Sequence, residues 1–443
     1  MSHRNFVIAL SVIGVFLAAS IGVIIYIWNT THEGDVSTPQ QVEAPLTTEQ
    51  LAENAFATGS AAVPASQIRP IDYEPILDAT YWNDEFPYQT QSFLVQRDTG
   101  PKKDYLELYP YLNTIFAGSR FAEGYYSPLP HPYAIVNVKE TPRLTPDHNA
   151  ACFSCKTPDY VIMEARNPEA TWATNFHEVS NQMTNAITCY DCHRNEPGRG
   201  LGGDGLDGGF TGSVRSHFSI WYEETRGSTA SCAQCHVEYY FDQTTHQVNL
   251  PPGPTDPSII FAYYNALGLV DHTNPNTGTE HIKVQHPEYQ HFAGSVHQQE
   301  GMTCVDCHMV RSTPDGAGGF LTNHTIQSPS QSEEILQSCI SCHPGSTNDV
   351  RQLITDTQTT ANARRDDLGN RLAVFMDDFA AAQQAGTLSD TQITVLRSME
   401  REAVFFFDWV FSENGNGVHN LEGHTIWLDR VEEVLSNAQP MLE

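Results

Sequence analysis

Positive charge is scarce in this sequence. Its 443 residues contain 23 lysines and arginines against 53 aspartates and glutamates, which gives a formal net charge of -30 at pH 7. Such an acidic surface repels nucleic-acid phosphates, so the composition excludes a DNA- or RNA-binding protein. Lysine is the rarer cation, with only five in the whole chain, and a lysine inside a motif is therefore informative.

The sequence also lacks any isolated cysteine. All ten cysteines belong to Cys-x-x-Cys pairs, which serve in proteins as disulfides, zinc ligands or haem attachment points. Successive pairs start 35 to 72 residues apart, without the rhythm of paired zinc knuckles, so the spacing argues against zinc. The pairs are Cys152/Cys155, Cys189/Cys192, Cys232/Cys235, Cys304/Cys307 and Cys339/Cys342.

The residue that follows each cysteine pair distinguishes haem attachment from a disulfide. Four pairs are followed directly by histidine. The motif Cys-x-x-Cys-His attaches c-type haem, because two thiols on one turn reach both vinyl groups while the histidine turns toward the iron. The four histidines are His193, His236, His308 and His343.

Lys156 takes the place of the histidine in the first pair. An amine binds iron only when it is deprotonated, so this substitution indicates a haem with chemistry of its own. The alternative is a degenerate site that has lost its iron ligand. We predict five covalently bound haems c, one of them with Lys156 as an iron ligand.

The N-terminal segment is predicted to anchor the protein in a membrane. Phe6–Trp28 is a run of 23 residues without a charge, which as a helix would extend about 34 Å. Arg4 precedes the run and acidic residues follow it, so the bulk of the chain should lie on the periplasmic or extracytoplasmic face. A cleaved signal peptide is the alternative reading of residues 1–28. Residues 29–69 are rich in Thr, Pro, Ala and Gln, as in a flexible linker.

Residues 70–443 are predicted to form one pentahaem catalytic domain of the mainly α class. Few long periodic segments occur between residues 150 and 345, as expected where haems supply much of the core. Strand signals are scarce, so we expect few short strands, and Ala134–Val138 is the best candidate.

Long helices are predicted from about residue 348 onward. Apolar residues from Leu353 to Phe379 recur at near-helical spacing, and Gly386 should end this helix. A second helix should begin after a Ser389 cap and extend to about Phe411.

Electron-transfer haems with one histidine ligand need a second axial ligand. Four of the 19 histidines follow cysteine pairs, so the other 15 are sufficient in number. Spacing alone assigns none of them, because a lone histidine is by default a surface or hydrogen-bonded residue.

The order of the motifs resembles a known family. Cys152-Phe-Ser-Cys155-Lys156 followed by four Cys-x-x-Cys-His motifs is similar to the pentahaem, ammonia-forming cytochrome c nitrite reductases. Further segments are also similar to that family, among them Glu140-Thr-Pro-Arg143, and the resemblance covers roughly residues 70 to 425. Two of the segments are longer. They are Cys232-Ala-Gln-Cys235-His236-Val-Glu238-Tyr239-Tyr-Phe and Lys283-Val-Gln285-His286-Pro-Glu.

The resemblance implies an active site at the lysine-ligated haem. In this family that haem binds substrate on its open side, and the matching pocket residues are Arg143, Tyr239 and His286. It also implies a calcium ion next to the pocket. The matching calcium ligands are the side chains of Glu238 and Gln285 and the backbone carbonyls of Tyr239 and Lys283, in line with calcium's preference for oxygen. On this reading the Lys283 ammonium is not expected to act as a charge partner.

The resemblance further implies the second axial ligand of each histidine-ligated haem. The assignments are His131 for the haem on Cys232/Cys235, His324 for that on Cys189/Cys192, His297 for that on Cys339/Cys342, and His419 for that on Cys304/Cys307.

The implied activity is the six-electron reduction of nitrite to ammonium, with four bis-histidine haems supplying electrons. A membrane-bound quinol-oxidising cytochrome is the expected electron donor, and a homodimer is the expected assembly. Two alternatives stay open on the sequence, namely a non-catalytic electron-transfer cytochrome and a multihaem reductase of hydroxylamine or sulfite.

Overall fold

The computed structural model describes residues 76–97, 101–193, 229–251, 256–317 and 319–442. The predicted membrane anchor at residues 1–28 and the predicted linker at residues 29–69 lie outside these ranges. Within them, no helix has the length and apolar character that crossing a bilayer requires.

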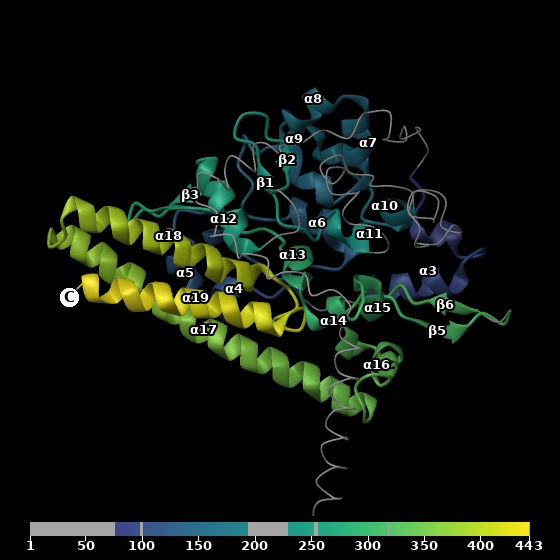
Figure 1. The fold of residues 1–443 in the computed structure, drawn as a ribbon. Coiled ribbons are helices and arrows are strands. Elements are labelled where there is room, and N and C mark those ends of the chain that lie inside the picture. The colour runs from purple at the N-terminus through teal and green to yellow at the C-terminus, as the bar shows by residue number, and fades with distance from the viewer. Residues whose placement is uncertain (1–75, 98–100, 194–228, 252–255, 318, 443) are drawn as a thin grey trace, which may run out of the picture. The chain divides into compact units, whose positions relative to one another are not determined.

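Helices dominate the described part of the chain, and most of those before residue 343 are short (Figure 1). Turns of 3-10 helix connect several of them, including η4 (His131–Tyr133) and η5 (Ala150–Cys155). The α-helices of this region are α3 (Pro87–Leu94), α4 (Tyr105–Leu108), α5 (Leu112–Ile115), α6 (Ala134–Lys139), α7 (Pro158–Arg166), α8 (Pro168–Trp172), α9 (Phe176–Val179), α10 (Cys189–His193), α11 (Thr229–Ala233), α12 (Pro257–Ala266), α13 (Glu288–Phe292), α14 (Val296–Gln299), α15 (Cys304–His308) and α16 (Glu333–Cys339).

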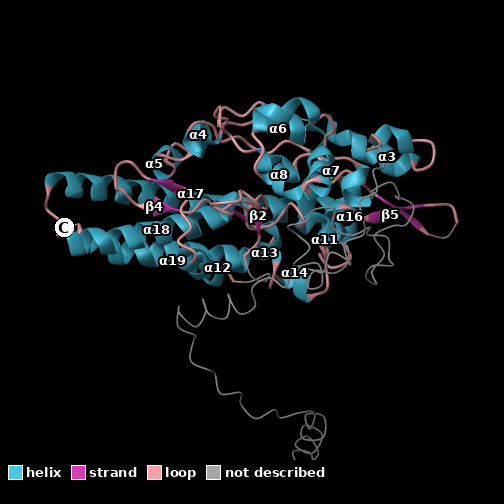
Figure 2. Cartoon of the chain, turned by 90° about the horizontal axis from the view of Figure 1, so that it is seen from above, coloured by secondary structure: helices cyan, strands magenta, loops and turns pink. Residues whose placement is uncertain are grey.

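In the described residues the strands are few and short, as predicted, and they form three separate antiparallel pairs. Figure 2 shows them as small magenta segments among the helices. The pairs are β1 (Tyr240–Phe241) with β2 (Val248–Asn249), β3 (His272–Thr273) with β4 (Glu280–His281), and β5 (Arg311–Pro314) with β6 (Phe320–Thr322).

The predicted strand at Ala134–Val138 is wrong, because this segment is helix α6. Two neighbouring residues, Ala134 and Ile135, are buried while Val136 is 39% exposed, so burial does not alternate as it does along a half-buried strand. The preceding turn η4 contains Pro132, whose fixed φ favours a helical start. A short apolar run does not distinguish helix from strand by itself.

Three longer helices complete the chain and lie side by side in Figures 1 and 2. They are α17 (Thr347–Ala385), α18 (Asp390–Ser412) and α19 (Leu421–Ala438). Capping boxes at Ser346 and Ser389 start the first two, and Gly386 ends α17 with a left-handed φ of 70°. The first two helices were predicted to within a few residues. Helix α19, capped by Asn420, was not predicted.

Two apolar clusters fill the interior of the described residues. The larger one, the C-terminal core, joins α17, α18 and α19 to α5 and α12, and includes Phe375, Phe405, Trp409, Leu428 and Val431. The smaller one, the lysine-motif core, lies behind the first cysteine pair. Its main members are Phe153, Tyr160, Trp172, Phe176 and Val179.

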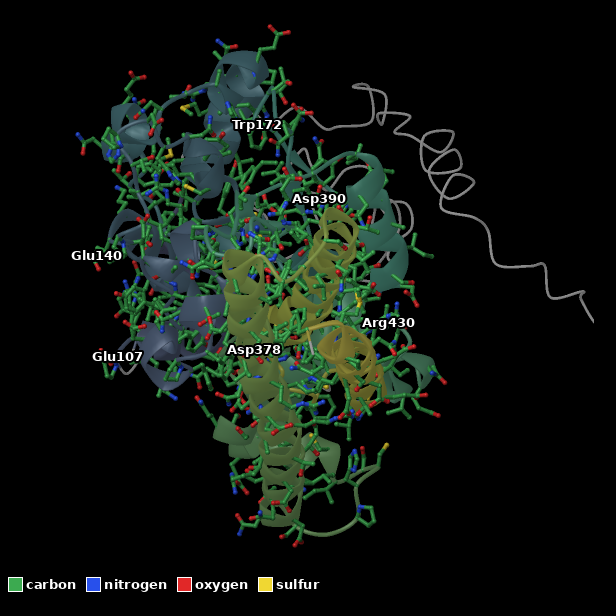
Figure 3. The ribbon with its side chains drawn as sticks, turned by 90° about the vertical axis from the view of Figure 1, so that its left-hand side faces the viewer. Glu107, Glu140, Trp172, Asp378, Asp390 and Arg430 are labelled. Atoms are coloured by element: carbon green, nitrogen blue, oxygen red, sulfur yellow. The ribbon has the colours of Figure 1, made fainter. Side chains whose placement is uncertain are left out.

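Part of the acidic charge lies on the outside of this framework. Glu107 and Glu140 are exposed and project from the edge of the molecule in Figure 3. Because water solvates these groups, the strong negative charge of the chain is compatible with an apolar interior.

Candidate functional site

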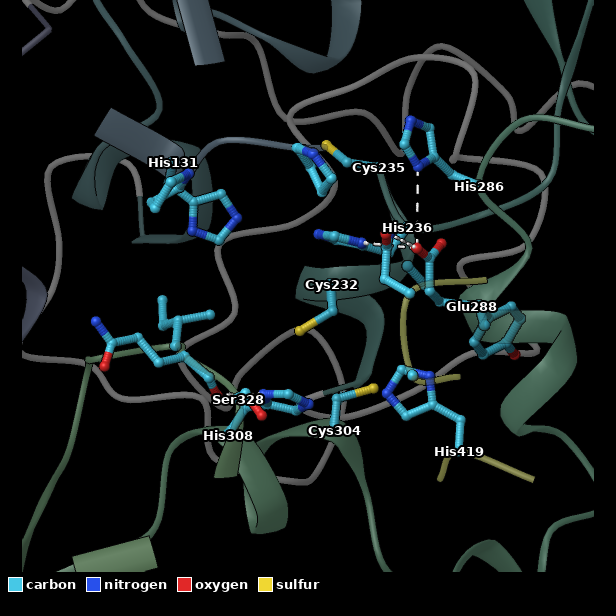
Figure 4. A pocket seen from close by; sticks show the side chains of 18 of the residues that line it. His131, Cys232, Cys235, His236, His286, Glu288, Cys304, His308, Ser328 and His419 are labelled. Atoms are coloured by element: carbon cyan, nitrogen blue, oxygen red, sulfur yellow. Dashed lines mark hydrogen bonds and ion pairs between the residues drawn. The ribbon is translucent and has the colours of Figure 1, made fainter. Parts of the chain in front are cut away.

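A large cavity runs among the short helices. Its volume is about 2650 Å³, well above the roughly 300–1,000 Å³ of an ordinary small-molecule site. Nine of the ten motif cysteines line it, and none of the ten forms a disulfide, so the disulfide interpretation of the pairs is wrong. Figure 4 shows Cys232, Cys304 and the imidazoles of His236, His308 and His419 within this cavity.

Each cysteine motif lies on a single helical turn. Helices α10 and α15 consist of the five motif residues themselves, and α16 ends at Cys339. The backbone N–H of His236 donates to the carbonyl of Cys232 at 2.9 Å, and that of His343 to Cys339 at 2.9 Å. Residues at these helical spacings share one face, so the backbone allows the two thiols and the histidine of a motif to point the same way.

Cys342, predicted to attach haem, is the most exposed of the motif cysteines. Its side chain is exposed and does not line the cavity, whereas Cys339 and His343 of the same motif do. Helix α16 ends at Cys339, and Cys342 lies in the turn that follows, beside the exposed Ser341. A haem attached to this motif would therefore have one of its two thioether bonds at a solvent-exposed edge.

Each of the four motif histidines faces the histidine that the family resemblance assigned to it. The ring centroids are 6.2–6.3 Å apart in all four pairs, and all eight rings line the cavity. Two imidazoles that share one metal are about 6 Å apart from centre to centre, given metal–nitrogen bonds of about 2 Å. These residues therefore fit a haem iron between each pair. The pairs are His131 with His236, His193 with His324, His297 with His343, and His308 with His419.

Hydrogen bonds orient several of these rings. The Nδ1 of His308 is 2.9 Å from the carbonyl oxygen of Gln327, and the Nδ1 of His324 is 2.8 Å from that of Thr322. A carbonyl only accepts, so each Nδ1 carries the proton and each Nε2 is left as the iron ligand. Sequence reasoning missed these partners, because any residue supplies a backbone carbonyl.

The His419 ring has a carboxylate partner instead. Its Nδ1 is hydrogen-bonded to Glu413, which is 1% exposed. Burial alone would raise the pKa of the Glu413 carboxyl, but the charge and hydrogen bond of His419 lower it to about 2. Glu413 therefore stays ionised against this imidazole, and sequence reasoning did not identify it.

Lys156 lies at the end of turn η5, beside Cys152 and Cys155, and lines the same cavity. Burial raises the pKa of the Cys152 thiol to about 12, although the charges of Lys156 and Arg143 act in the opposite direction. The Lys156 charge also lowers the pKa of His286. The first motif thus brings an amine, a guanidinium and an imidazole into one electrostatic neighbourhood.

Arg143 is held in a defined orientation. Its Nε donates to the hydroxyl of Thr141 at 3.0 Å, and its guanidinium carbon lies 4.2 Å from the centroid of the Phe121 ring. Burial lowers the pKa of Arg143, while the neighbouring Tyr239 and Cys152 raise it. No carboxylate among the described residues forms a salt bridge with this guanidinium, so its positive charge is available to an anionic ligand in the cavity.

His286 shares a carboxylate with a motif histidine. Glu288 Oε1 lies 3.9 Å from the Nδ1 of His286 and 3.9 Å from the Nδ1 of His236, as the dashed lines in Figure 4 show. Burial alone would raise the pKa of Glu288, but the two imidazoles lower it well below its ordinary value. Burial lowers the pKa of His286 itself. The role of Glu288 was missed, although it lies only two residues after His286.

The predicted calcium ligands form one hydrogen-bonded group. Glu238 is fully buried, and its carboxylate accepts from the Gln285 backbone N–H at 2.7 Å and the Tyr264 hydroxyl at 3.1 Å. The Gln285 side-chain amide lies 3.0 Å from the carbonyl oxygen of Lys283. Burial raises the pKa of Glu238 well above its ordinary value. The structure therefore joins the Glu238 carboxylate, Gln285 and the Lys283 carbonyl in one hydrogen-bonded group, in which the Gln285 amide nitrogen is the donor to that carbonyl.

The expectation that the Lys283 ammonium has no charge partner is wrong. Its Nζ lies 2.9 Å from the Asp408 carboxylate and donates to the Ser412 hydroxyl at 2.9 Å. It also lies 4.7 Å from the centroid of the Phe121 ring. A buried ammonium needs an anion to offset its lost hydration, and the side chain meets Asp408 while the backbone carbonyl faces Gln285.

Together the fold and the cavity define a multihaem c-type cytochrome. Residues 78–442 match the cytochrome c552 family, and the chain therefore belongs to that family. Its five cysteine motifs are the attachment points of covalently bound haem c.

Two relatives and one solved structure give the context of this family. The chain is 27% identical over 363 residues to a cytochrome c-552 of Maridesulfovibrio salexigens, covering 76% of this chain and 70% of the relative. It is 29% identical over 360 residues to a cytochrome c-552 of Parabacteroides distasonis, covering 76% and 71%. The fold is similar to the catalytic subunit of the cytochrome c nitrite reductase from Desulfovibrio desulfuricans, which has two calcium sites. The TM-score is 0.72 at 21% identity, and the match covers 82% of this chain and 86% of that one.

Proposed function

We propose that this protein reduces nitrite to ammonium at the haem attached to Cys152 and Cys155. The observation that carries the proposal is the neighbourhood of the one motif without histidine. Lys156 lines the same cavity as Arg143, Tyr239 and His286, whereas each of the other four motifs presents an imidazole to a second imidazole. The reaction would consume six electrons and eight protons per nitrite and release ammonium and two waters.

Arg143 would bind the substrate anion. Its guanidinium is fixed by Thr141 and Phe121 and has no carboxylate competitor among the described residues, so its charge is free to pair with a nitrite oxygen. Local positive charge of this kind outweighs a distant acidic surface, because salt screens charges over about 8 Å at physiological ionic strength. The same contact would stabilise negative charge that develops as N–O bonds break.

His286 and Tyr239 would hold protons for the reaction. Burial lowers the pKa of His286 and raises that of Tyr239 well above its ordinary value, so at neutral pH the imidazole is uncharged and the phenol is protonated. Both groups then serve as hydrogen-bond donors within the cavity. Glu288 would keep the His286 ring oriented.

The haems, when bound, would supply irons that bind the substrate nitrogen and pass single electrons. Lys156 would be an iron ligand of the catalytic haem. The four histidine pairs would hold the others, which would receive electrons from a membrane-bound quinol-oxidising cytochrome. We further propose that the protein acts on the extracytoplasmic face of the membrane, anchored by residues 1–28, and forms a homodimer.

A calcium ion bound by Glu238, Gln285 and the carbonyls of Tyr239 and Lys283 would complete the site. These residues offer the oxygen donors that calcium prefers. Its charge would favour the ionised form of Glu238, against the effect of burial. It would also fix the segment from Lys283 to His286, and with it the proton-holding imidazole.

An anaerobic assay with reduced viologen tests the proposal. We expect one ammonium per nitrite and a high-spin electron paramagnetic resonance signal from one haem in five. An all-low-spin spectrum without nitrite turnover would instead identify an electron-transfer cytochrome. A higher kcat/KM with hydroxylamine or sulfite than with nitrite would assign the site to one of those substrates.

A further inference from the structure

A second group of ligating side chains lies outside the haem cavity. It consists of His291 on α13, Glu413 directly after α18, and His424 on α19, which are 3%, 1% and 1% exposed. Their ligand atoms all lie within 4.8 Å of one another. None of the three lines the large cavity, so the site is separate from the haems.

Several polar atoms of this group have no protein partner. They are the Nε2 of His291, both ring nitrogens of His424 and the Oε2 of Glu413. Buried polar atoms are almost always satisfied, and this concentration of orphaned acceptors and donors at one point indicates a bound species. The space between the three side chains is small, so it would hold a metal ion or a structural water.

The donor set favours a transition metal. Two imidazole nitrogens with one carboxylate oxygen suit zinc and its neighbours, whereas calcium and magnesium prefer oxygen ligands throughout. The rings of His291 and His424 are nearly perpendicular, at 89°, with centroids 6.1 Å apart. This separation is about that of two imidazoles that share one metal, and a ligand atom of each ring lies within 4.8 Å of the other.

We propose that His291, Glu413 and His424 bind a zinc-class divalent cation, with water as a fourth ligand. Nothing in the nitrite-reducing site uses these residues. The site joins α13, which follows His286, to the ends of α18 and α19, so the metal would tie the C-terminal helices to the haem-bearing part of the chain.

The same metal would act on one haem through Glu413. One oxygen of this carboxylate is hydrogen-bonded to the Nδ1 of His419, and the other is the free metal ligand. A cation on the free oxygen withdraws charge from the carboxylate and makes His419 a less basic iron ligand. Removing the cation should therefore shift the potential of the haem held by His308 and His419 to lower values.

Metal analysis of the full-length holoprotein tests the site, with iron as an internal count of the haems. We expect about one zinc-class ion per chain in the wild type and at least about a tenfold loss in His424→Gln and His291→Gln at unchanged iron content. His272→Gln is the matched control. His272 is also buried, and both of its ring nitrogens lack partners, but it lies in strand β3 outside the cluster.

X-ray absorption at the zinc edge of the wild type keeps the test independent of whether the variants fold. A shell of nitrogen and oxygen with imidazole scattering supports the site. A shell of sulfur would place the zinc on incompletely loaded cysteine motifs and overturn the proposal, as would metal-free wild type or unchanged metal content in His424→Gln. Chelation followed by zinc chloride alone should lower and then restore the potential of one haem, and no shift would overturn the link to His419.

Discussion

The region of the cysteine motifs and the C-terminal helices differ in what surrounds their side chains. Helices α17, α18 and α19 share the C-terminal core, in which Phe405, Trp409 and Leu428 are completely buried. Helix α15, by contrast, consists of a haem motif and has no buried residue. Around the motifs the space between helices is a cavity rather than packed side chains. The comparison indicates that covalent haems supply the interior of one region and apolar side chains that of the other.

The first motif packs on an apolar cluster, the lysine-motif core. Phe153, which lies between Cys152 and Cys155, is fully buried in the lysine-motif core and stacks on Phe176 with centroids 4.3 Å apart and planes 11° apart. Trp172 closes this core and donates its indole N–H to Glu164 at 3.1 Å. The motif proposed to be catalytic therefore has a protein scaffold of its own, which fits the need of a reactive site for fixed geometry.

The largest expected effect is that removal of the haems destabilises the motif region but not the C-terminal helices. Protein produced without haem attachment should lose hydrogen-exchange protection by more than about 100-fold around α10, α11 and α15, because these turns pack mainly around the cavity. Helices α17–α19 should keep most of their protection. Peptide-resolved exchange against the holoprotein measures both. Equal loss in both regions would show that they depend on one shared core.

The next prediction tests how much the lysine-motif core stabilises the protein. Phe153→Ala removes a fully buried ring, so we expect it to lower the free energy of unfolding of the holoprotein by about 3–5 kcal/mol. A urea titration measures this loss. The control is Leu108→Ala, at a side chain that is 52% exposed and does not line the cavity, and it should change the value by less than about 0.5 kcal/mol. A cost for Phe153→Ala as small as that of the control would remove the scaffold argument.

A smaller effect concerns substrate binding beside that scaffold. Arg143→Ala should raise the KM for nitrite about 10- to 100-fold, which corresponds to the roughly 1.5–3 kcal/mol of a hydrogen bond to a charged group. Steady-state kinetics with reduced viologen provide the measurement. Arg430→Ala is the control, since Arg430 pairs with Glu402 and Glu433 on the surface of α19. An unchanged KM in Arg143→Ala would reject this residue as the anion site.

The smallest effect tests whether surface charge holds the C-terminal helices together. Glu432 pairs with Arg371 at 2.8 Å and Arg364 at 3.3 Å, but it is 44% exposed, so Glu432→Ala should cost less than about 1 kcal/mol. The hydrogen bond of Arg371 lowers the pKa of Glu432 from 4.5. The contribution is therefore complete above pH 4.5 and is lost as pH falls through the lowered value. Urea titrations at about pH 7 and about pH 4 compare the variant with Phe375→Ala, which should cost about 3–5 kcal/mol at either pH.

Local signals explain what was predictable in the fold. The capping serines, the apolar spacing of α17 and α18 and the left-handed Gly386 are all encoded within a few residues, and both helices were predicted closely. Helix α19 was missed, although Asn420 and the buried residues Leu428, Val431 and Leu435 follow helical spacing. The error at Ala134–Val138 arose because β-branched residues are common in strands, whereas packing against the neighbouring turn decided for a helix.

The sequence by itself determined the covalent chemistry of this protein, because attachment of a haem needs only two thiols and a ligand on one turn. It also singled out Lys156 as the one departure among five motifs. Spacing assigned no second imidazole to any motif; the family resemblance named the four pairs, and the fold brings them together. Only the tertiary structure decided the exposure of Cys342 and placed the carboxylates of Glu288 and Glu413 beside their histidines. These features depend on contacts between segments that lie far apart along the chain, or on acidic residues that no sequence pattern distinguishes from other acidic residues. Only the folded backbone therefore determines them.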